Sequence, residues 1–387
     1  MSKPLGFEKP LGMRDILPGA LQKQRWLQHR LLESMGQWGY CEIMTPTLEY
    51  YDTVGGASAT LEERLFKLLD SQGKTLVLRP DMTAPIARVA SSLLKEEPFP
   101  LRLMYSSNVF RAQAKEAGRN AEYFQTGVEL IGSNTVDGDA EVIALAVSVL
   151  KAAGLKEFKI AIGHVGFLEG LLEETVDEAE QREELKGYLH NRNFVGFRKY
   201  VDSLGLDNEK ELRLKELLTL RGGEELIQRA EAITINGKAR KAVTNLRQLW
   251  DALEAYQLTD SVLFDLNLLS NLNYYTGILF EGYAAGQGFP ICTGGRYDGL
   301  MAQFGRPAPA TGFAVQMDRL MEAAPFVAKE MPRTLVLYRS EQRTIALEKA
   351  RLLRQEVGVV VTQRKDEWDP RTSESYDRVL DLTKEAQ

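Results

Sequence analysis

The spacing of apolar residues changes repeatedly along the chain and predicts an alternation of helices and strands. Between residues 20 and 38 apolar side chains recur every three or four positions, including Leu27, Leu31 and Met35, which predicts an amphipathic helix. The next stretch, YCEIMTPTLEYYD, has an extended pattern that Pro46 interrupts. The chain therefore opens with a helix followed by a broken extended segment.

Two long strands in the first half of the chain form a predicted hairpin. The preceding stretch, KTLVLRPDMTAPIARVA, predicts a strand, a sharp turn at residues 79–81 and a helix. PLRLMYSSNVFRAQ and AEYFQTGVELIG then predict the two strands, joined by a polar loop of about ten residues, which is long for a hairpin tip. An apolar helix over residues 139–153 and a strand–helix unit, EFKIAIGHVGFLEGLL, complete this part.

Shifts in composition indicate the organisation of the remaining chain. From residue 173 to about residue 258 the pattern is charged and helical, which predicts a helical insertion. Strand patterns return in residues 261–280, in GFPICTGGRYDGLM and in TGFAVQMDRLM. After a linker near residues 328–332, RTLVLYRS, a helical stretch and GVVVTQR predict the opening of a small α/β unit. We therefore expect a first core segment (1–172), the helical insertion (173–260), a second core segment (261–327) and a short C-terminal α/β unit (333–387).

Composition and charge argue against several classes of protein. The chain has 387 residues, of which 44% are hydrophobic and 26% charged, as in ordinary globular proteins of two or three domains. No stretch approaches the ~20 apolar residues of a membrane helix, and the N-terminus lacks the apolar segment of a secretory signal. The net charge of −6 disfavours a nucleic acid as partner, because nucleic-acid binding usually requires a basic patch.

Cysteine and histidine usage predicts neither a disulfide framework nor a metal site. Cys41 and Cys292 are too few for such a framework, and no histidine stands at metal-ligand spacing from either. His29, His164 and His190 are scattered and have no acid or base partner in the sequence pattern, so we interpret them as structural or surface residues. We expect a cytoplasmic protein in a reducing environment, with no metal and no cofactor.

The second strand of the hairpin carries the most informative polar pattern. Side chains alternate along a strand, so Gln125, Gly127 and Glu129 share one face. Gly127 is expected to leave a gap in which a small ligand could lie, although a solvent-facing strand with an incidental glycine has the same pattern. Arg111, at the end of the first strand, stands an even number of residues after Tyr105, so both side chains are expected on the same face. Its guanidinium suits a carboxylate or phosphate, and a surface salt bridge is the alternative.

Two short turns add further polar candidates. Asp81 and Thr83 stand two residues apart at the start of a predicted helix, where they could receive an ammonium group or simply cap the helix. TGGRYDGLM places two glycines before Arg296. Glycines permit close approach of a ligand to the backbone, and a turn or bulge explains them equally well.

Taken together, these pieces resemble the catalytic core of histidyl-tRNA synthetase, a class II aminoacyl-tRNA synthetase. GYCEIMTPTLEYYDTVG, VFRAQAKEAGRNAEYFQTGVELIG and GFAVQMDRL are similar to motifs 1, 2 and 3 of that class. LRPDMTA resembles the amino-acid-binding turn of the family, while LNYYTGILFEGY and TGGRYDGL resemble its two histidine-specific segments. The resemblance covers roughly residues 5–325 in the same motif order. It implies an α+β fold with an antiparallel sheet flanked by helices.

The departures from the synthetase pattern fall mainly on the side that would activate the amino acid. A synthetase has arginine, glycine, leucine and aspartate before its tyrosine pair, where this chain has Ser270, Asn271, Leu272 and Asn273. The arginine of the synthetase is a positioned cation that this chain lacks, and the loss of such a group typically lowers the rate by a factor on the order of 10²–10³. Gln113 replaces a glutamate that faces adenine, and Gln316 replaces a glycine beneath the nucleotide. The C-terminal unit is also too short for a complete anticodon-binding domain.

The amino-acid side of the pattern is retained. The resemblance implies that histidine is bound by Asp81, Thr83, Arg111, Gln125, Glu129, Tyr274 and Tyr275. It also implies candidate anion or nucleotide contacts at Arg119, Arg296 and Arg319, for which inherited salt bridges are the alternative. The sequence therefore predicts a pocket that binds histidine without activating it.

A synthetase-like chain with this pattern resembles the regulatory subunits of ATP phosphoribosyltransferase, including the stretches FEKPLGMRDILPG and GKTLVLRPDMTAPIARVA. That resemblance implies a non-catalytic protein of histidine biosynthesis, which acts at its first step. It implies a short-form catalytic subunit as partner, activation of that subunit, and feedback inhibition with histidine as effector. A homodimer built through motif 1 is implied within the hetero-oligomer.

Two enzymatic interpretations remain open. The first is an active histidyl-tRNA synthetase with a shortened C-terminus, because Arg111, Arg119 and Arg319 resemble the ATP-binding arginines of that family. The second is a synthetase-like enzyme that activates another amino acid for an acceptor other than tRNA. Both require a working ATP site, which the residues at positions 270 and 316 disfavour.

Overall fold

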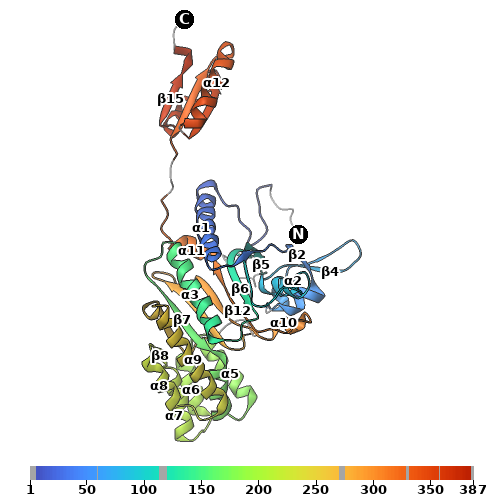
Figure 1. Ribbon diagram of the computed structural model, residues 1–387, viewed down its shortest axis with the longest axis vertical. Helices are drawn as coiled ribbons and strands as arrows, with labels where there is room; N and C mark the ends of the chain where they lie inside the picture. The colour runs from blue at the N-terminus through green and yellow to red at the C-terminus, as the bar shows by residue number, and fades with distance from the viewer. Residues whose placement is uncertain are drawn as a thin grey trace. The chain divides into compact units, whose positions relative to one another are not determined.

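The computed structural model describes residues 6–58, 60–112, 120–269, 275–327, 331–356 and 358–384. The chain forms two compact units, residues 1–325 and residues 326–387 (Figure 1). Within the described ranges no helix has the length and apolar character needed to cross a membrane.

A nine-stranded sheet organises the described part of the first unit. Its spatial order is β1 (Cys41–Glu42), β5 (Leu101–Phe110), β6 (Glu122–Ile131), β12 (Ala310–Gln316), β11 (Cys292–Arg296), β10 (Ile278–Ala284), β7 (Phe158–His164), β9 (Val262–Asp265) and β8 (Arg221–Gly222). Neighbouring strands are antiparallel except in the pairs β1–β5 and β7–β9. Parallel neighbours need a crossover connection, and a long one separates the strands of each pair in sequence. The sheet is therefore mainly antiparallel, with two parallel pairings towards its edges.

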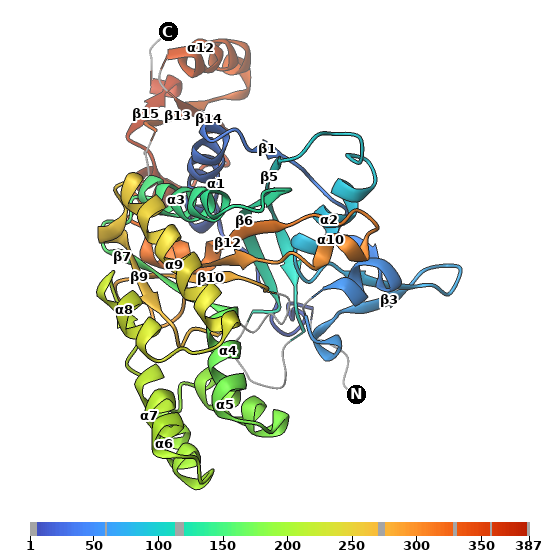
Figure 2. The ribbon, with the colours of Figure 1, turned by 60° about the horizontal axis from the view of Figure 1, so that its bottom comes forward.

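Alternation along β5 gives the sheet two buried faces. Met104 belongs to the core beneath α1 (Pro18–Gln37) and α3 (Val136–Ala152), whereas Leu103 and Tyr105 belong to the core beneath α2 (Thr83–Ser91). Figures 1 and 2 show α1 and α3 along one face of the sheet. The predicted stripe of α1 is buried there, because Leu27, Leu31 and Met35 are fully enclosed.

The opposite face of the sheet is covered by shorter elements. They are α2 and α10 (Leu300–Gln303), and a separate small antiparallel sheet consists of β2 (Leu48–Tyr50), β4 (Thr75–Leu78) and β3 (Lys67–Leu69). The turn between β4 and α2 carries Arg79 and Asp81, as the sequence pattern predicts. Arg79 donates to the carbonyls of Thr45 and Asn108 at 2.6 and 2.8 Å, which holds this turn against the hairpin.

Helices follow β7 over the region predicted as an insertion. They are α4 (Val165–Thr175), α5 (Ala179–His190), α6 (Phe194–Ser203), α7 (Asn208–Leu217), α8 (Glu225–Ala232) and α9 (Gly237–Ala255). Side chains of Asn193, Asp207 and Asn236 accept backbone N–H groups at the starts of α6, α7 and α9. The buried leucines of these helices are continuous with the core beneath α3.

The second unit is a small three-stranded parallel sheet with one long helix. The strand order is β14 (Val359–Arg364), β13 (Arg333–Tyr338) and β15 (Arg378–Asp381), and α12 (Arg343–Glu356) connects β13 to β14. Val336, Ala346 and Ala350 lie in its small core. A strand, a helix and a strand in this order match the α/β pattern predicted for this part of the chain.

Candidate functional site

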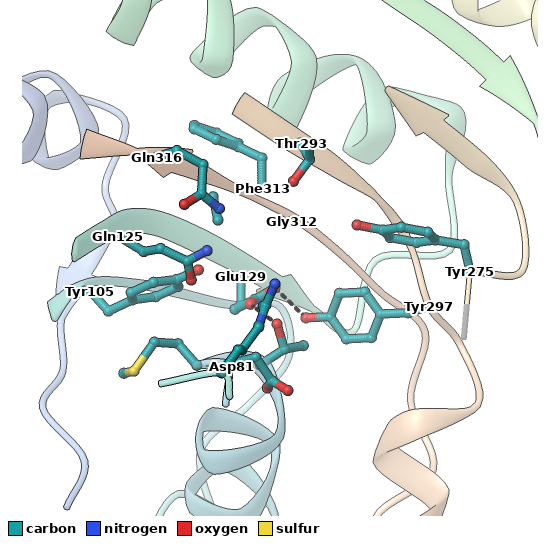
Figure 3. Close-up of a pocket in the computed structure, with 14 residues that line it drawn as sticks. Asp81, Tyr105, Gln125, Glu129, Tyr275, Thr293, Tyr297, Gly312, Phe313 and Gln316 are labelled. Atoms are coloured by element: carbon teal, nitrogen blue, oxygen red, sulfur yellow. Dashed lines mark hydrogen bonds between the residues drawn. The ribbon is translucent and has the colours of Figure 1, made fainter. Parts of the chain in front are cut away.

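A small polar cavity lies where β5, β6, β11 and β12 meet the turn before α2 (Figure 3). Its volume is about 60 Å³, and we call it the inner pocket. Among the residues proposed from the sequence, those that line it are Asp81, Thr83, Arg111, Gln125, Glu129 and Tyr275. Tyr274, Arg119, Gln113 and Ser270 lie outside the described residues.

Glu129 lies at the buried end of the inner pocket. Its Oε1 accepts a hydrogen bond of 2.8 Å from the Thr83 hydroxyl, and its Oε2 accepts one from the Tyr297 hydroxyl (Figure 3). Only 2% of Glu129 is exposed. Burial raises the pKa of Glu129 to about 8, although the two hydroxyl donors oppose this shift.

Asp81 serves both the helix and the pocket. Its Oδ1 accepts the backbone N–H of Ala84 at 3.0 Å, so it caps the first turn of α2. Its Oδ2 accepts the hydroxyl of Ser58. Because Asp81 also lines the cavity, the capping and ligand-facing interpretations of this residue are compatible.

The prediction of an open space beside Gly127 is wrong. Tyr105 is its partner in the β5–β6 register, and a Cβ on Gly127 would lie 2.6 Å from the Tyr105 hydroxyl oxygen. The phenol ring therefore fills the gap between Gln125 and Glu129. Glycine is needed here because a large ring occupies the space, so Tyr105 rather than a ligand covers this point of the strand.

Gly312 on β12 makes a second close approach. It is the register partner of Glu129, and a Cβ there would lie 2.1 Å from Glu129 Oε2. The buried carboxylate therefore lies directly on the backbone of β12.

Arg111 stands at the opening of the inner pocket. Its Nε donates to the carbonyl of Pro80 at 2.8 Å, and no carboxylate of the described residues forms an ion pair with it. The guanidinium is half-buried, and within the described part of the chain it has no anionic partner. An Arg in this state can bind a carboxylate with two parallel hydrogen bonds.

A larger cleft of about 530 Å³ adjoins the inner pocket, and we call it the outer cleft. Arg111, Thr293 and Gln316 line both cavities, so these residues form the boundary. Gln316 is the register partner of Gln125, and Figure 3 shows the two side chains near one another. A glutamine side chain therefore lies where the resemblance leads us to expect a glycine.

Arg319 and Arg192 both line the outer cleft. Arg319 donates to the Pro290 carbonyl at 2.6 Å, and burial lowers its pKa. Arg192, from the turn between α5 and α6, donates to the Tyr283 hydroxyl on β10 at 2.6 Å. The helical insertion thus contacts the sheet across this cleft.

Arg296 has a different environment from the other candidate arginines. Its guanidinium forms an ion pair of 2.8 Å with Asp139 and one of 3.1 Å with Asp298, and it also donates to the carbonyl of Ser133. It lines neither the inner pocket nor the outer cleft. In the described residues it therefore ties β11 to α3.

Several residues of the inner pocket were not proposed from the sequence. They are Met82, Tyr105, Thr293, Tyr297, Gly312, Phe313, Ala314 and Gln316. Tyr105 lies an even number of residues before Arg111, so alternation places both side chains on one face, and Tyr297 directly follows Arg296 in the TGGRYDGL motif. The sequence therefore contained a signal for both residues. Thr293 and Phe313 become neighbours only through strand pairing. No group of three metal-ligating side chains occurs among the residues with described positions.

Comparison with known proteins places this geometry in context. The family model for histidyl-tRNA synthetase matches residues 12–320. A relative from Halalkalibacterium halodurans, named ATP phosphoribosyltransferase regulatory subunit, is 48% identical over 365 residues, which cover 94% of this chain and 92% of that one. A relative of the same name from Bacillus subtilis is 50% identical over 92% of this chain and 91% of its own length.

Solved structures of the same families are similar to this chain. A crystal structure described as an ATP phosphoribosyltransferase regulatory subunit/histidyl-tRNA synthetase from Bacillus halodurans C has a TM-score of 0.91 and 46% identity, covering 98% of this chain and 99% of that one. Histidyl-tRNA synthetase from Nostoc sp. PCC 7120 has a TM-score of 0.79 at 18% identity, covering 96% of this chain and 89% of that one. The class II synthetase fold predicted from motif order is thereby confirmed.

Proposed function

Because the chain belongs to the family of ATP phosphoribosyltransferase regulatory subunits, which has the histidyl-tRNA synthetase fold, we propose that it binds histidine in the inner pocket and does no chemistry on it. Its role is then to activate a short-form catalytic subunit and to transmit feedback inhibition by histidine. The supporting observation is the composition of the inner pocket, whose groups complement a zwitterionic amino acid with a polar ring.

Each end of histidine has a partner of suitable chemistry in this pocket. Asp81 and Thr83, with Gln125 nearby, suit the α-ammonium group, and Arg111 suits the α-carboxylate. Glu129 lies deepest and suits a ring N–H group. Tyr275 provides an aromatic wall for the ring.

Two observations favour binding without activation. Gln316 lies on the boundary between the inner pocket and the outer cleft, where a nucleotide phosphate would have to approach the bound carboxylate. Ser270 also replaces the cation that the resemblance places beside the reacting groups. Without that charge the activation step loses its main electrostatic stabilisation.

Regulation then follows from linkage. Histidine can inhibit only if it binds one state of the complex with the catalytic subunit more tightly than another. The proposal therefore requires a measurable difference in histidine affinity between the active and inhibited complexes. A homodimer of this chain within the complex belongs to the same proposal.

The first experiment is histidine-dependent ATP–pyrophosphate exchange on the purified full chain, beside a histidyl-tRNA synthetase as control. We expect no exchange from a folded sample that binds histidine in calorimetry. Clear exchange would show a working activation site and would favour the synthetase alternative, for which the supporting observation is that neither Arg111 nor Arg319 forms an ion pair with a carboxylate in the described ranges. Adding a short-form ATP phosphoribosyltransferase should then give activity that histidine inhibits.

A further inference from the structure

The described residues that line the inner pocket carry more negative than positive charge when they are ionised. Among the described residues that line it, Asp81 and Glu129 supply two carboxylates and Arg111 supplies one guanidinium, so their sum is −1. Zwitterionic histidine with a neutral ring leaves this sum unchanged. An unbalanced buried charge is costly, so one further proton, which would neutralise this charge, would stabilise the pocket with histidine bound.

Glu129 is the group best placed to hold that proton. It is fully enclosed, and its carboxyl accepts hydrogen bonds from Thr83 and Tyr297. A carboxylate can accept at about four positions, so it can also meet a ring nitrogen of a ligand. Burial raises the pKa of Glu129 to about 8, the hydroxyls of Tyr297 and Thr83 oppose the shift, and the charge of Asp81 adds to it.

Other titratable groups surround this carboxyl from several elements. They are Asp81 before α2, Tyr105 and Arg111 from β5 and its end, Tyr275, Tyr297 after β11, and Tyr40 before β1. On β12 the neighbour of Glu129 is Gly312, which does not titrate. Burial raises the pKa of Tyr105 and of Tyr40 well above that of Glu129, so neither of these phenols competes for the proton near neutral pH.

We infer that the inner pocket with histidine bound holds one proton beyond those of the zwitterion with a neutral ring, and that the Glu129 carboxyl and the imidazole ring share this proton. This inference rests on the proposed function and deepens it. The proton lies either on the ring, facing ionised Glu129, or on Glu129, facing a neutral ring nitrogen. Both forms require a ring with a basic nitrogen, so the pocket selects an amino acid with a basic diazole side chain over an apolar ring of the same size.

The sign of the pH dependence follows from counting protons. Free Glu129 keeps its proton up to about pH 8, while the ring of free histidine loses its own above about pH 6.5. Between these values the pocket itself brings the proton, and binding exchanges none with solvent. At higher pH binding must take one proton from solvent, so affinity falls as pH rises. At lower pH both partners are protonated, one proton is released, and affinity falls as pH decreases.

The test is calorimetry of histidine binding to the full chain in pairs of buffers with different ionisation enthalpies. Beyond the uptake that the ammonium group of histidine contributes, we expect about one proton at about pH 9 and only a small fraction of one at about pH 7.5, with affinity about fivefold to tenfold weaker at the higher pH. Glu129→Gln keeps the size of the side chain and should reduce the uptake at about pH 9 to the part that the ammonium group of histidine contributes, while retaining proton release at low pH. It also corrects for titration of the ammonium group of histidine itself.

Tyr297→Phe provides a second variant that does not depend on removing the carboxyl. It takes away a hydrogen bond that favours ionised Glu129, so the onset of proton uptake should move to higher pH. Proton uptake at about pH 9 equal to that of Glu129→Gln, with the same change of affinity between the two pH values, would overturn this inference alone. Absence of histidine binding by folded protein at every pH would overturn the proposed function, and this inference with it.

Discussion

Tyr105 and Gly127 are direct partners across β5 and β6, and the phenol ring occupies the space that a side chain at position 127 would need. A Cβ there would also lie 2.3 Å from the carbonyl oxygen of Phe313. The backbone of β12 cannot move aside as a flexible side chain can. The pairing therefore sets one wall of the inner pocket.

We expect Gly127→Ala to destabilise the protein by about 1–3 kcal/mol through overpacking, measured as a lower thermal unfolding midpoint. Gly187→Ala is the matched control, since Gly187 lies within α5 and has no neighbour within 4 Å of the added Cβ. The control should be neutral or slightly stabilising, because alanine favours a helix. Equal midpoints for Gly127→Ala and wild type would contradict the packing described here.

Removing Glu129 or Tyr275 should weaken histidine binding. Glu129→Ala deletes a charged hydrogen-bond partner, which is worth roughly tenfold or more in affinity. Tyr275→Ala deletes an aromatic wall and should have a smaller effect, of about 0.5–1.5 kcal/mol. Calorimetry on both variants, with the exposed Glu33→Ala on α1 as control, provides the measurement. Unchanged affinity in both pocket variants would refute the assignment of the inner pocket.

Breaking the pair of Arg296 and Asp139 should affect stability. Both side chains are buried, and Arg296→Met would leave the Asp139 carboxylate without its cation. We expect a loss of about 3–5 kcal/mol in the free energy of unfolding, measured with urea. Because Arg296 lines neither cavity, histidine affinity of the folded variant should stay near the wild-type value. A large loss of affinity with unchanged stability would instead indicate a ligand contact.

His164 should make stability dependent on pH. Burial lowers the pKa of His164 to about 4, and a hydrogen bond with Asn245 opposes this only in part. In the unfolded chain the pKa is about 6.5, so the unfolded state binds more protons between these values. The stability contribution of neutral His164 is therefore present above about pH 6.5 and is lost as pH falls towards 4.

The comparison of wild type with His164→Gln isolates this effect. Urea unfolding at about pH 7 and about pH 5 should show the wild type losing about 2 kcal/mol more than the variant. His29→Gln, at an exposed position on α1, is the control and should keep the wild-type pH dependence. Parallel pH curves for wild type and His164→Gln would show that His164 is not the group responsible.

The sequence by itself determined the order of the elements and much of the candidate site. Periodicity is a local property, so the stripe of α1, the hairpin of β5 and β6, and the turn that carries Asp81 could be predicted before any contact was known. The ordered motifs predicted the class II fold, which the family match and solved structures confirm. Alternation placed Gln125 and Glu129 on one face, and both line the inner pocket.

Only the tertiary structure decided what surrounds each of these side chains. Tyr297 donates to Glu129 from 168 residues away, and Asp139 pairs with Arg296 across 157 residues, so neither partner follows from spacing along the chain. The burial that raises the pKa of Glu129 likewise depends on distant segments, because β12 pairs with β6 and α2 packs against the same face. Local pattern selects helix or strand, whereas pairing and desolvation depend on which distant segments pack together.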